Sequence, residues 1–135
     1  MAEPTAPAED LHLAIQVMLL PKDTNAHGTI FGGVILSQID LAAAVEARRH
    51  TAQRVVTVAM REVVFHEPVF VGDVVRFLTR LVRVGKTSVT VAVLVEAVRA
   101  QDPGCVVKVT EAEVVYVAVD ADGHKTPVIR RHADF

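Results

Sequence analysis

The stretch TSVTVAVLVEAVRA, residues 87–100, carries the clearest structural pattern of the chain. Its core-type residues fall on every second position: Val89, Val91, Val93, Val95 and Ala97. A period of two is typical of a β-strand with one face packed on a core, and β-branched residues favour strands over helices. The stretch therefore predicts a long strand with one covered face.

The same composition extends to both sides of this strand. Of the chain's 27 valines, 23 lie between Val55 and Val119, in segments separated by Gly, Pro and Asp. These turn residues predict four strands, at 55–65, 74–84, 87–100 and 105–119. The connections are too short for parallel crossovers, so we expect successive strands to be antiparallel neighbours. Leu11–Leu20 ends at Pro21 and is predicted as a fifth strand, although its periodicity also fits a helix.

One segment has the composition of a helix. Val34–Arg49 is rich in alanine, contains no Gly or Pro, and carries basic residues in its last turn. Apolar residues occur around most of its circumference, which predicts a buried helix. Five antiparallel strands and one buried helix indicate an α+β domain in which the sheet wraps around the helix.

Length and charge limit the classes of function. The chain has 135 residues, enough for one core, and we expect residues 1–10 to be disordered and 11–135 to form a single domain. A net charge of −2 argues against a sequence-independent nucleic-acid binder or a membrane-surface protein. The lone Cys105 forms no internal disulfide, and the N-terminus lacks a signal peptide's positive charge, so a cytoplasmic location is expected.

Asp40 is the residue most suggestive of chemistry. It lies in the middle of the apolar helix, and no nearby residue in the sequence neutralises it. A buried carboxylate normally has a raised pKa, a polar partner from elsewhere, or a site open to substrate. These are also the needs of a catalytic base or nucleophile, although a purely structural carboxylate fits as well.

The loop before the helix, Pro21–Gly33, is dense in hydrogen-bonding residues. Gly32 and Gly33 are expected to place bare backbone N–H groups at the helix N-terminus, where they favour developing negative charge. Asn25 and His27 either orient a water or a carbonyl, or close an Asx turn. The six histidines show no metal-ligand spacing, so we expect neither a metal nor a cofactor.

Taken together, the order of elements and the motifs resemble the cytosolic acyl-CoA thioesterases of the hot-dog fold, in the YciA-like branch. The resemblance runs from about Leu13 to Val119. Five segments carry it: PKDTNAHGTIFGG (21–33), SQID (37–40), RVVTVAM (54–60), FHEPVFVGDVV (65–75) and VGKTSVTV (84–91). It implies a curved antiparallel sheet around a long central helix, hydrolysis of acyl-CoA to CoA and a carboxylic acid, and two subunits with their sheets side by side.

The resemblance also implies roles for residues. The catalytic carboxylate falls on Asp40, as nucleophile or general base, and the loop asparagine falls on Asn25, with the two contributed by different subunits. The backbone N–H of the glycine pair, chiefly Gly33, would polarise the thioester carbonyl. Arg54 and Lys86 are candidates for the CoA phosphates. The remaining candidate substrate contacts are Gly32, His27, Ser37, Val56, Thr57, Thr87 and Ser88.

Some alternatives stay open. A non-catalytic acyl-CoA-binding module would keep the fold with a structural Asp40, and a hot-dog hydratase would need His27 as the partner of that aspartate. Val34 stands where relatives often carry a bulky aromatic residue, which is expected to change the acyl pocket. The excess of valine over what one small sheet can cover predicts a homo-oligomer. The resemblance implies a homodimer as the minimal active unit and a homohexamer, a trimer of such dimers, as the assembly. No nucleic-acid or membrane partner is expected.

Overall fold

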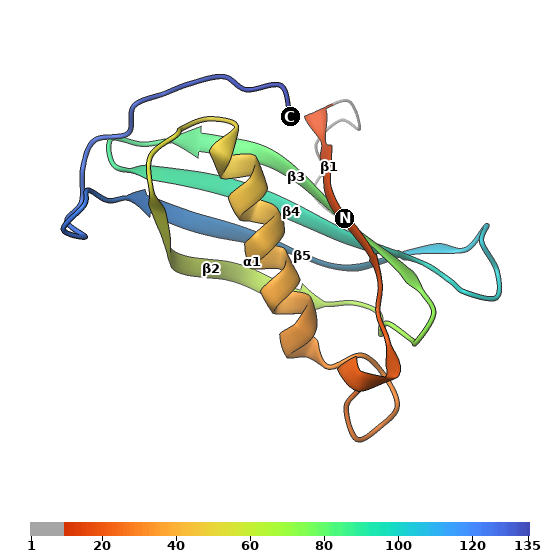
Figure 1. Ribbon diagram of the computed structural model, residues 1–135. Coiled ribbons are helices and arrows are strands. Elements are labelled where there is room, and N and C mark those ends of the chain that lie inside the picture. The colour runs from red at the N-terminus through yellow and green to blue at the C-terminus, as the bar shows by residue number, and fades with distance from the viewer. Residues whose placement is uncertain (1–9) are drawn as a thin grey trace.

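A computed structural model describes residues 10–135 of the chain. One helix lies across a five-stranded antiparallel sheet whose order is β1-β3-β4-β5-β2 (Figure 1). The elements are β1 (His12–Met18), the 3₁₀ helix η2 (Pro21–Asp23), α1 (Gly32–Arg48), β2 (Val55–Phe65), β3 (Val74–Val84), β4 (Ser88–Val98) and β5 (Val106–Ala118). Apart from Asp10, the segment expected to be disordered lies outside the described residues. Within residues 10–135, no helix is long and apolar enough to cross a membrane.

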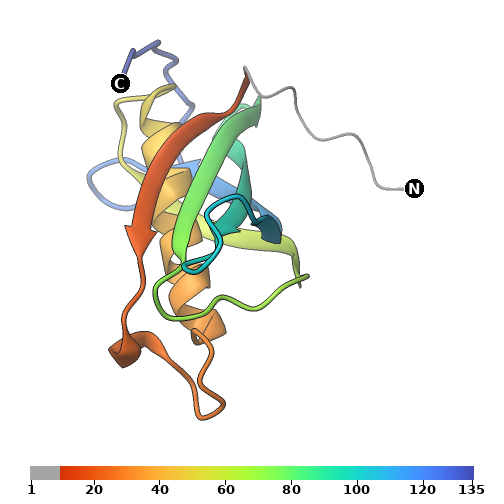
Figure 2. The same ribbon diagram turned by 90° about the vertical axis from the view of Figure 1, so that its right-hand side faces the viewer.

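The strand predictions are confirmed, with ends shifted by one or two residues. The segment after residue 11 is strand β1, which pairs with β3, so the helical alternative for it is wrong. The alternation in β4 places all five of its predicted core residues in the interior: Val89, Val91, Val93, Val95 and Ala97. The sheet curves around α1, which packs on its inner face (Figure 2).

One expected strand pairing is wrong. β2 does not neighbour β3, because it pairs with β5 on the far side of the sheet. The intervening segment 66–73 crosses three strand spacings, about 14 Å. Eight extended residues can span about 26 Å, so this connection needs no helix.

The helix differs from the prediction at its start and in its burial. It begins at Gly32 rather than Val34. One face, including Ile35, Ile39 and Ala43, is fully covered by the sheet. Leu41 is 56% exposed and Val45 is also exposed, so a wholly buried helix is wrong for the single chain. A helix on one face of one sheet has only one side covered, which leaves an apolar face available to another subunit.

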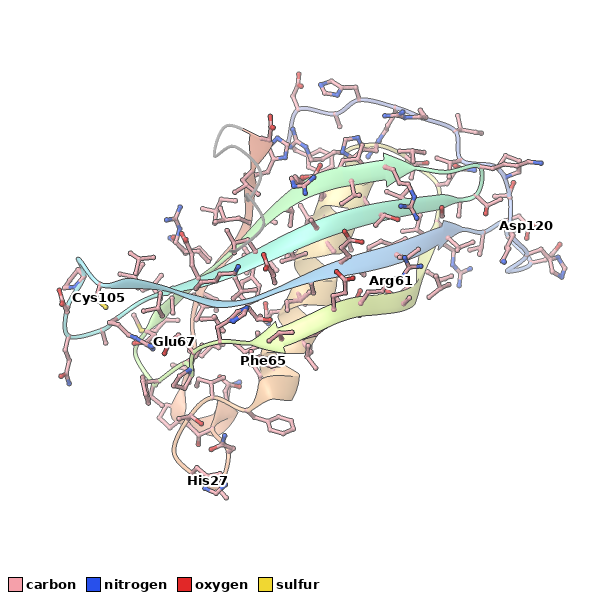
Figure 3. The ribbon with its side chains drawn as sticks, turned by 180° about the vertical axis from the view of Figure 1, so that it is seen from behind. His27, Arg61, Phe65, Glu67, Cys105 and Asp120 are labelled. Carbon is pink, nitrogen blue, oxygen red and sulfur yellow. The ribbon has the colours of Figure 1, made fainter. Side chains whose placement is uncertain are left out.

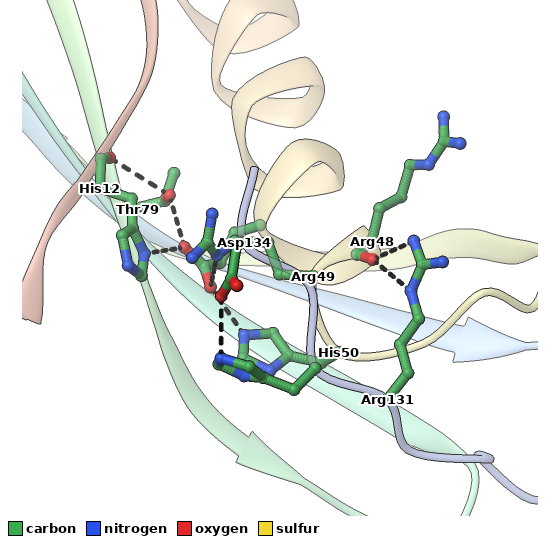
Figure 4. A network of polar contacts seen from close by, with 9 residues as sticks. His12, Arg48, Arg49, His50, Thr79, Arg131 and Asp134 are labelled. Atoms are coloured by element: carbon green, nitrogen blue, oxygen red, sulfur yellow. Dashed lines mark hydrogen bonds and ion pairs between the residues drawn. The ribbon is translucent and has the colours of Figure 1, made fainter.

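The C-terminal end of α1 is fixed by a buried carboxylate, Glu46, whose partners His12, His50 and Thr79 are labelled in Figure 4. His12 Nδ1 and His50 Nε2 each lie 2.7 Å from one of its oxygens, and the Thr79 hydroxyl donates to Oε1 at 2.9 Å. Burial alone would raise the pKa of Glu46, but the hydrogen bonds from His50, His12 and Thr79 outweigh it and lower the pKa below its ordinary value. The C-terminal tail also contacts this end of the helix, because the Arg131 guanidinium donates two hydrogen bonds to the carbonyl oxygen of Arg48.

Candidate active site

Asp40 is the ninth of the 17 residues of α1 and is half-buried. The Thr57 hydroxyl donates to its Oδ1 at 2.9 Å. The Tyr116 hydroxyl lies 2.9 Å from the same oxygen and 2.6 Å from the backbone oxygen of Asp40. Of the three possibilities raised for a carboxylate in an apolar helix, the structure shows polar partners, and both belong to the same chain as Asp40.

The pairing of β2 with β5 explains how both hydroxyls reach one oxygen. Thr57 and Tyr116 are directly opposite each other in the register of these two strands. Opposed residues of antiparallel strands project from the same face of the sheet. This face carries α1, so the pair meets the helix at Asp40. Burial raises the pKa of Tyr116, and the nearby Asp40 raises it further, so the phenol stays protonated and serves as a donor.

Asn25 forms its side-chain hydrogen bonds within its own loop. Its Oδ1 accepts from the backbone N–H of His27 at 2.8 Å and of Thr29 at 3.2 Å. Its Nδ2 donates to the Thr29 hydroxyl at 2.8 Å. These bonds favour the Asx-turn alternative, in which Asn25 shapes the loop. His27 lies exposed at the loop tip, away from the sheet (Figure 3), and within one chain it is not brought to Asp40.

Gly32 and Gly33 are the first two residues of α1, not the residues before it. The Val34 N–H donates to the Phe31 carbonyl at 3.0 Å. Within the described chain the N–H groups of Gly32 and Gly33 donate to no acceptor, as expected for a helix N-terminus. A Cβ on Gly33 would lie 2.5 Å from the Phe31 ring. The prediction of available N–H groups at this turn is consistent with the structure.

The candidate residues lie at three separate levels along the axis of α1: the glycine turn at its start, Asp40 in its middle, and Arg54 and Thr87 near its end. Seven residues separate Gly33 from Asp40, roughly 10 Å along the helix axis. Arg54 and Thr87 flank the end of β5, because their carbonyls accept from the Val119 and Ala118 N–H groups. This end of the sheet lies at the helix C-terminus, opposite to the glycine turn (Figure 1). One chain alone therefore does not gather the whole candidate site.

The other candidate substrate contacts are accessible. Arg54 and Lys86 are exposed, and neither forms an ion pair with any residue from 10 to 135. Val56 is exposed on β2, and Ser88 begins β4, with its carbonyl accepting from Gly85 N–H. Ser37 is exposed on α1, but its hydroxyl donates to the carbonyl of Val34. No single contact distinguishes these residues from ordinary surface positions.

Two features of the site were not identified from the sequence. Tyr116 is the chain's only tyrosine, and its place in a valine strand was the one available signal. The second feature is a cavity of about 360 Å³ beside the helix N-terminus. Val34 does not line it. Its lining is mostly apolar: Ile30, Gly32, Ile35, Phe65, His66, Glu67, Pro68, Val69 and Val109.

Asp120, Asp122 and His124 form an exposed cluster whose possible ligand atoms lie within 4.8 Å of one another. The Asp120 carboxylate accepts from the backbone N–H of Asp122 at 2.9 Å and of His124 at 3.0 Å. A turn closed by its own aspartate accounts for this cluster, and we assign it no ligand.

Comparison with known proteins places this geometry in a family. A sequence profile of the thioesterase superfamily matches residues 27–103. The chain is 42% identical over 118 residues to the acyl-CoA thioester hydrolase YciA of Salmonella typhimurium, covering 86% of this chain and 89% of that protein.

Solved structures agree. A hexameric hotdog fold thioesterase of Campylobacter jejuni is 48% identical, with a TM-score of 0.80 over 87% of this chain and 90% of that one. An acyl-CoA hydrolase of Staphylococcus aureus, solved with butyryl coenzyme A and coenzyme A, is 27% identical, with a TM-score of 0.78 over 91% and 74% of the two chains. The fold is therefore the hot-dog fold, and the chain belongs to the thioesterase superfamily, in the branch of the YciA acyl-CoA thioester hydrolases.

Proposed function

We propose that this protein hydrolyses acyl-CoA thioesters to coenzyme A and a carboxylic acid. The observation that carries the proposal is Asp40, a half-buried carboxylate on the helix of a thioesterase fold with its Oδ1 held by Thr57 and Tyr116. A carboxylate whose orientation is fixed by two hydroxyl groups is suited to act as a general base or as a nucleophile. The relatives' hydrolase activity supports the same reaction.

The chemistry needs two elements, and the chain has both. Backbone N–H groups of Gly32 and Gly33 are suited to the oxygen of the thioester carbonyl, where negative charge develops. Asp40 either takes a proton from the attacking water, or attacks the carbonyl carbon to form an acyl-aspartyl anhydride that water then cleaves, which restores the carboxylate. In both routes the C–S bond breaks, the water oxygen ends in the carboxylic acid, and CoA leaves as the thiol. No bound cofactor is part of this proposal.

We propose a site shared between two subunits. β2 forms an outer edge of the sheet and carries exposed apolar side chains, an arrangement that favours pairing with another chain. Two-fold pairing of β2 edges would run the strands antiparallel. It would set the loop and glycine turn of one subunit near Arg54 and Lys86 of its partner. The dimer would thus bring together the two groups of candidate residues that lie apart within one chain. Three such dimers would give a hexamer, the assembly of the Campylobacter jejuni relative.

The cavity beside Gly32 is the proposed acyl pocket. Its volume is within the range of small-molecule sites, and its lining is largely apolar. It opens next to the N–H groups that would face the carbonyl. The exposed cations Arg54 and Lys86, with Thr87 and Ser88, are proposed to contact the CoA phosphates. A cytoplasmic location is proposed because the only cysteine, Cys105, is free.

The proposed function is tested by thiol release from acyl-CoAs ranging from acetyl to palmitoyl. Multiple turnovers with at least one chain length are expected. Tight CoA binding without turnover would replace the proposal with a binding module, and hydration of an enoyl-CoA without thiol release would replace it with a hydratase.

A further inference from the structure

We propose that Tyr116 is a positioning residue that determines which oxygen of Asp40 reacts, by holding Oδ1 and leaving Oδ2 to the thioester or the water. This inference rests on the proposed thioester hydrolysis and adds to it the identity of the reactive atom.

The two oxygens of Asp40 have unequal environments. Both hydroxyl donors, from Thr57 and Tyr116, lie 2.9 Å from Oδ1. No hydrogen bond to Oδ2 is made by any residue from 10 to 135. An oxygen that accepts two hydrogen bonds has its lone pairs occupied, whereas a free carboxylate oxygen keeps its basicity and can approach a substrate. Oδ2 is therefore the atom available for chemistry.

Tyr116 is the more rigid of the two donors. It is 2% exposed and belongs to β5, which is hydrogen-bonded to β4 on one side and β2 on the other. Thr57 is exposed and lies on the outer strand β2. The single proton of the tyrosine hydroxyl is shared between Oδ1 and the backbone carbonyl oxygen of Asp40, 2.6 Å away, and this three-centre contact ties the carboxylate to the backbone of its own helix. The ring thus fixes the rotamer of Asp40 from inside the fold.

This position predicts a particular kinetic signature. Because Tyr116 is buried, its removal should leave substrate binding, and hence KM, nearly unchanged. Losing a hydrogen bond to a charged group should lower kcat by about 10- to 100-fold. The bond also stabilises the charged form of the carboxylate, so the acidic limb of the kcat profile should move to higher pH.

The test compares Tyr116→Phe with Thr79→Val. The hydroxyl of Thr79 is buried and donates a hydrogen bond of equal length, 2.9 Å, to Glu46. Glu46 is the other carboxylate of α1, so Thr79→Val removes a matched hydrogen bond away from Asp40. Thr79→Val should lower the melting temperature but leave kcat, KM and the acidic limb as in the wild type. Tyr116→Phe should lower kcat and move the acidic limb of the kcat profile to higher pH, while its KM stays within about twofold of the wild-type KM. An unshifted limb with wild-type kcat, or the same kinetic change in both variants, would overturn the inference.

A second measurement keeps the hydroxyl in place in case Tyr116→Phe does not fold. Tyr116 is the only tyrosine, so growth on a fluorinated tyrosine labels this position alone. A more acidic phenol donates a stronger hydrogen bond, and the acidic limb should move to lower pH. No movement would contradict the inference. Both tests require that the wild type hydrolyses acyl-CoA. A wild type that is inactive on every chain length would contradict the proposed function, whereas an active wild type with no effect at Tyr116 would contradict this inference alone.

Discussion

The edge strand β2 makes a quantitative prediction about assembly. Val58, near the middle of this edge, is 54% exposed. Full burial of a valine stabilises by about 1.5–3 kcal/mol, so covering this exposed half contributes about 1 kcal/mol per protomer. Val58→Lys removes this contribution and adds the cost of desolvating an ammonium group, for a loss on the order of 3 kcal/mol per protomer. A two-fold interface contains the change twice, so the dissociation constant should rise by about four orders of magnitude.

Sedimentation at micromolar concentration measures this effect. The wild type should have at least twice the 14.6 kDa mass of one chain, and Val58→Lys should sediment as one chain with an unchanged circular dichroism spectrum. Thiol release should fall with dissociation, since the site is shared. The matched control is Val106→Lys, at a valine that is 50% exposed but lies outside the stretch of β5 paired with β2. A wild-type mass for Val58→Lys, or equal dissociation of the control, would show that the β2 edge is not the interface.

Three further changes address the helix and the pocket. Glu46→Gln should destabilise the protein by about 1–3 kcal/mol at pH 7. Because folding lowers the pKa of Glu46, the wild type's excess in free energy of unfolding should hold above about pH 4.5 and shrink as the pH falls further. Urea unfolding of both proteins at matched concentration measures this excess, and a value that does not change with pH would contradict the role of the Glu46 charge. Gly33→Ala should displace the Phe31 ring, 2.5 Å from the added Cβ, and lower kcat/KM with little change in melting temperature; unchanged turnover would argue against a role for this turn. Phe65→Ala should enlarge the cavity and shift the preference in thiol release toward longer acyl chains, whereas an unchanged preference would place the acyl chain elsewhere.

The fold was largely predictable because its signals are local. The period of two in β4 and the valine segments around it identify each strand. The pairing of β2 was not predictable in this way. It depends on which edge of the sheet remains open once the hairpins from β3 to β5 have formed, and the short segment 66–73 permits either side.

The site was predictable only in part. Asp40 was identifiable because a carboxylate is out of place in an apolar helix. Thr57 was reached only through the resemblance, and Tyr116 was missed. Their convergence on one oxygen depends on the register of β2 against β5, which a single sequence does not reveal. The expectation of a buried helix was wrong for the chain alone, because the apolar residues on its open face lack a covering element within the described chain.

The proposed function depends above all on Asp40 as the group that carries out thioester hydrolysis. Asp40→Asn keeps the size of the side chain and the acceptor oxygen for Thr57 and Tyr116, while removing the negative charge. The decisive measurement is thiol release by this variant and by the wild type, on the best acyl-CoA and at equal oligomeric mass. Loss of at least about 100-fold in kcat, with CoA affinity retained, is expected for a group that acts as base or nucleophile. Wild-type turnover by Asp40→Asn would show that Asp40 is neither the base nor the nucleophile.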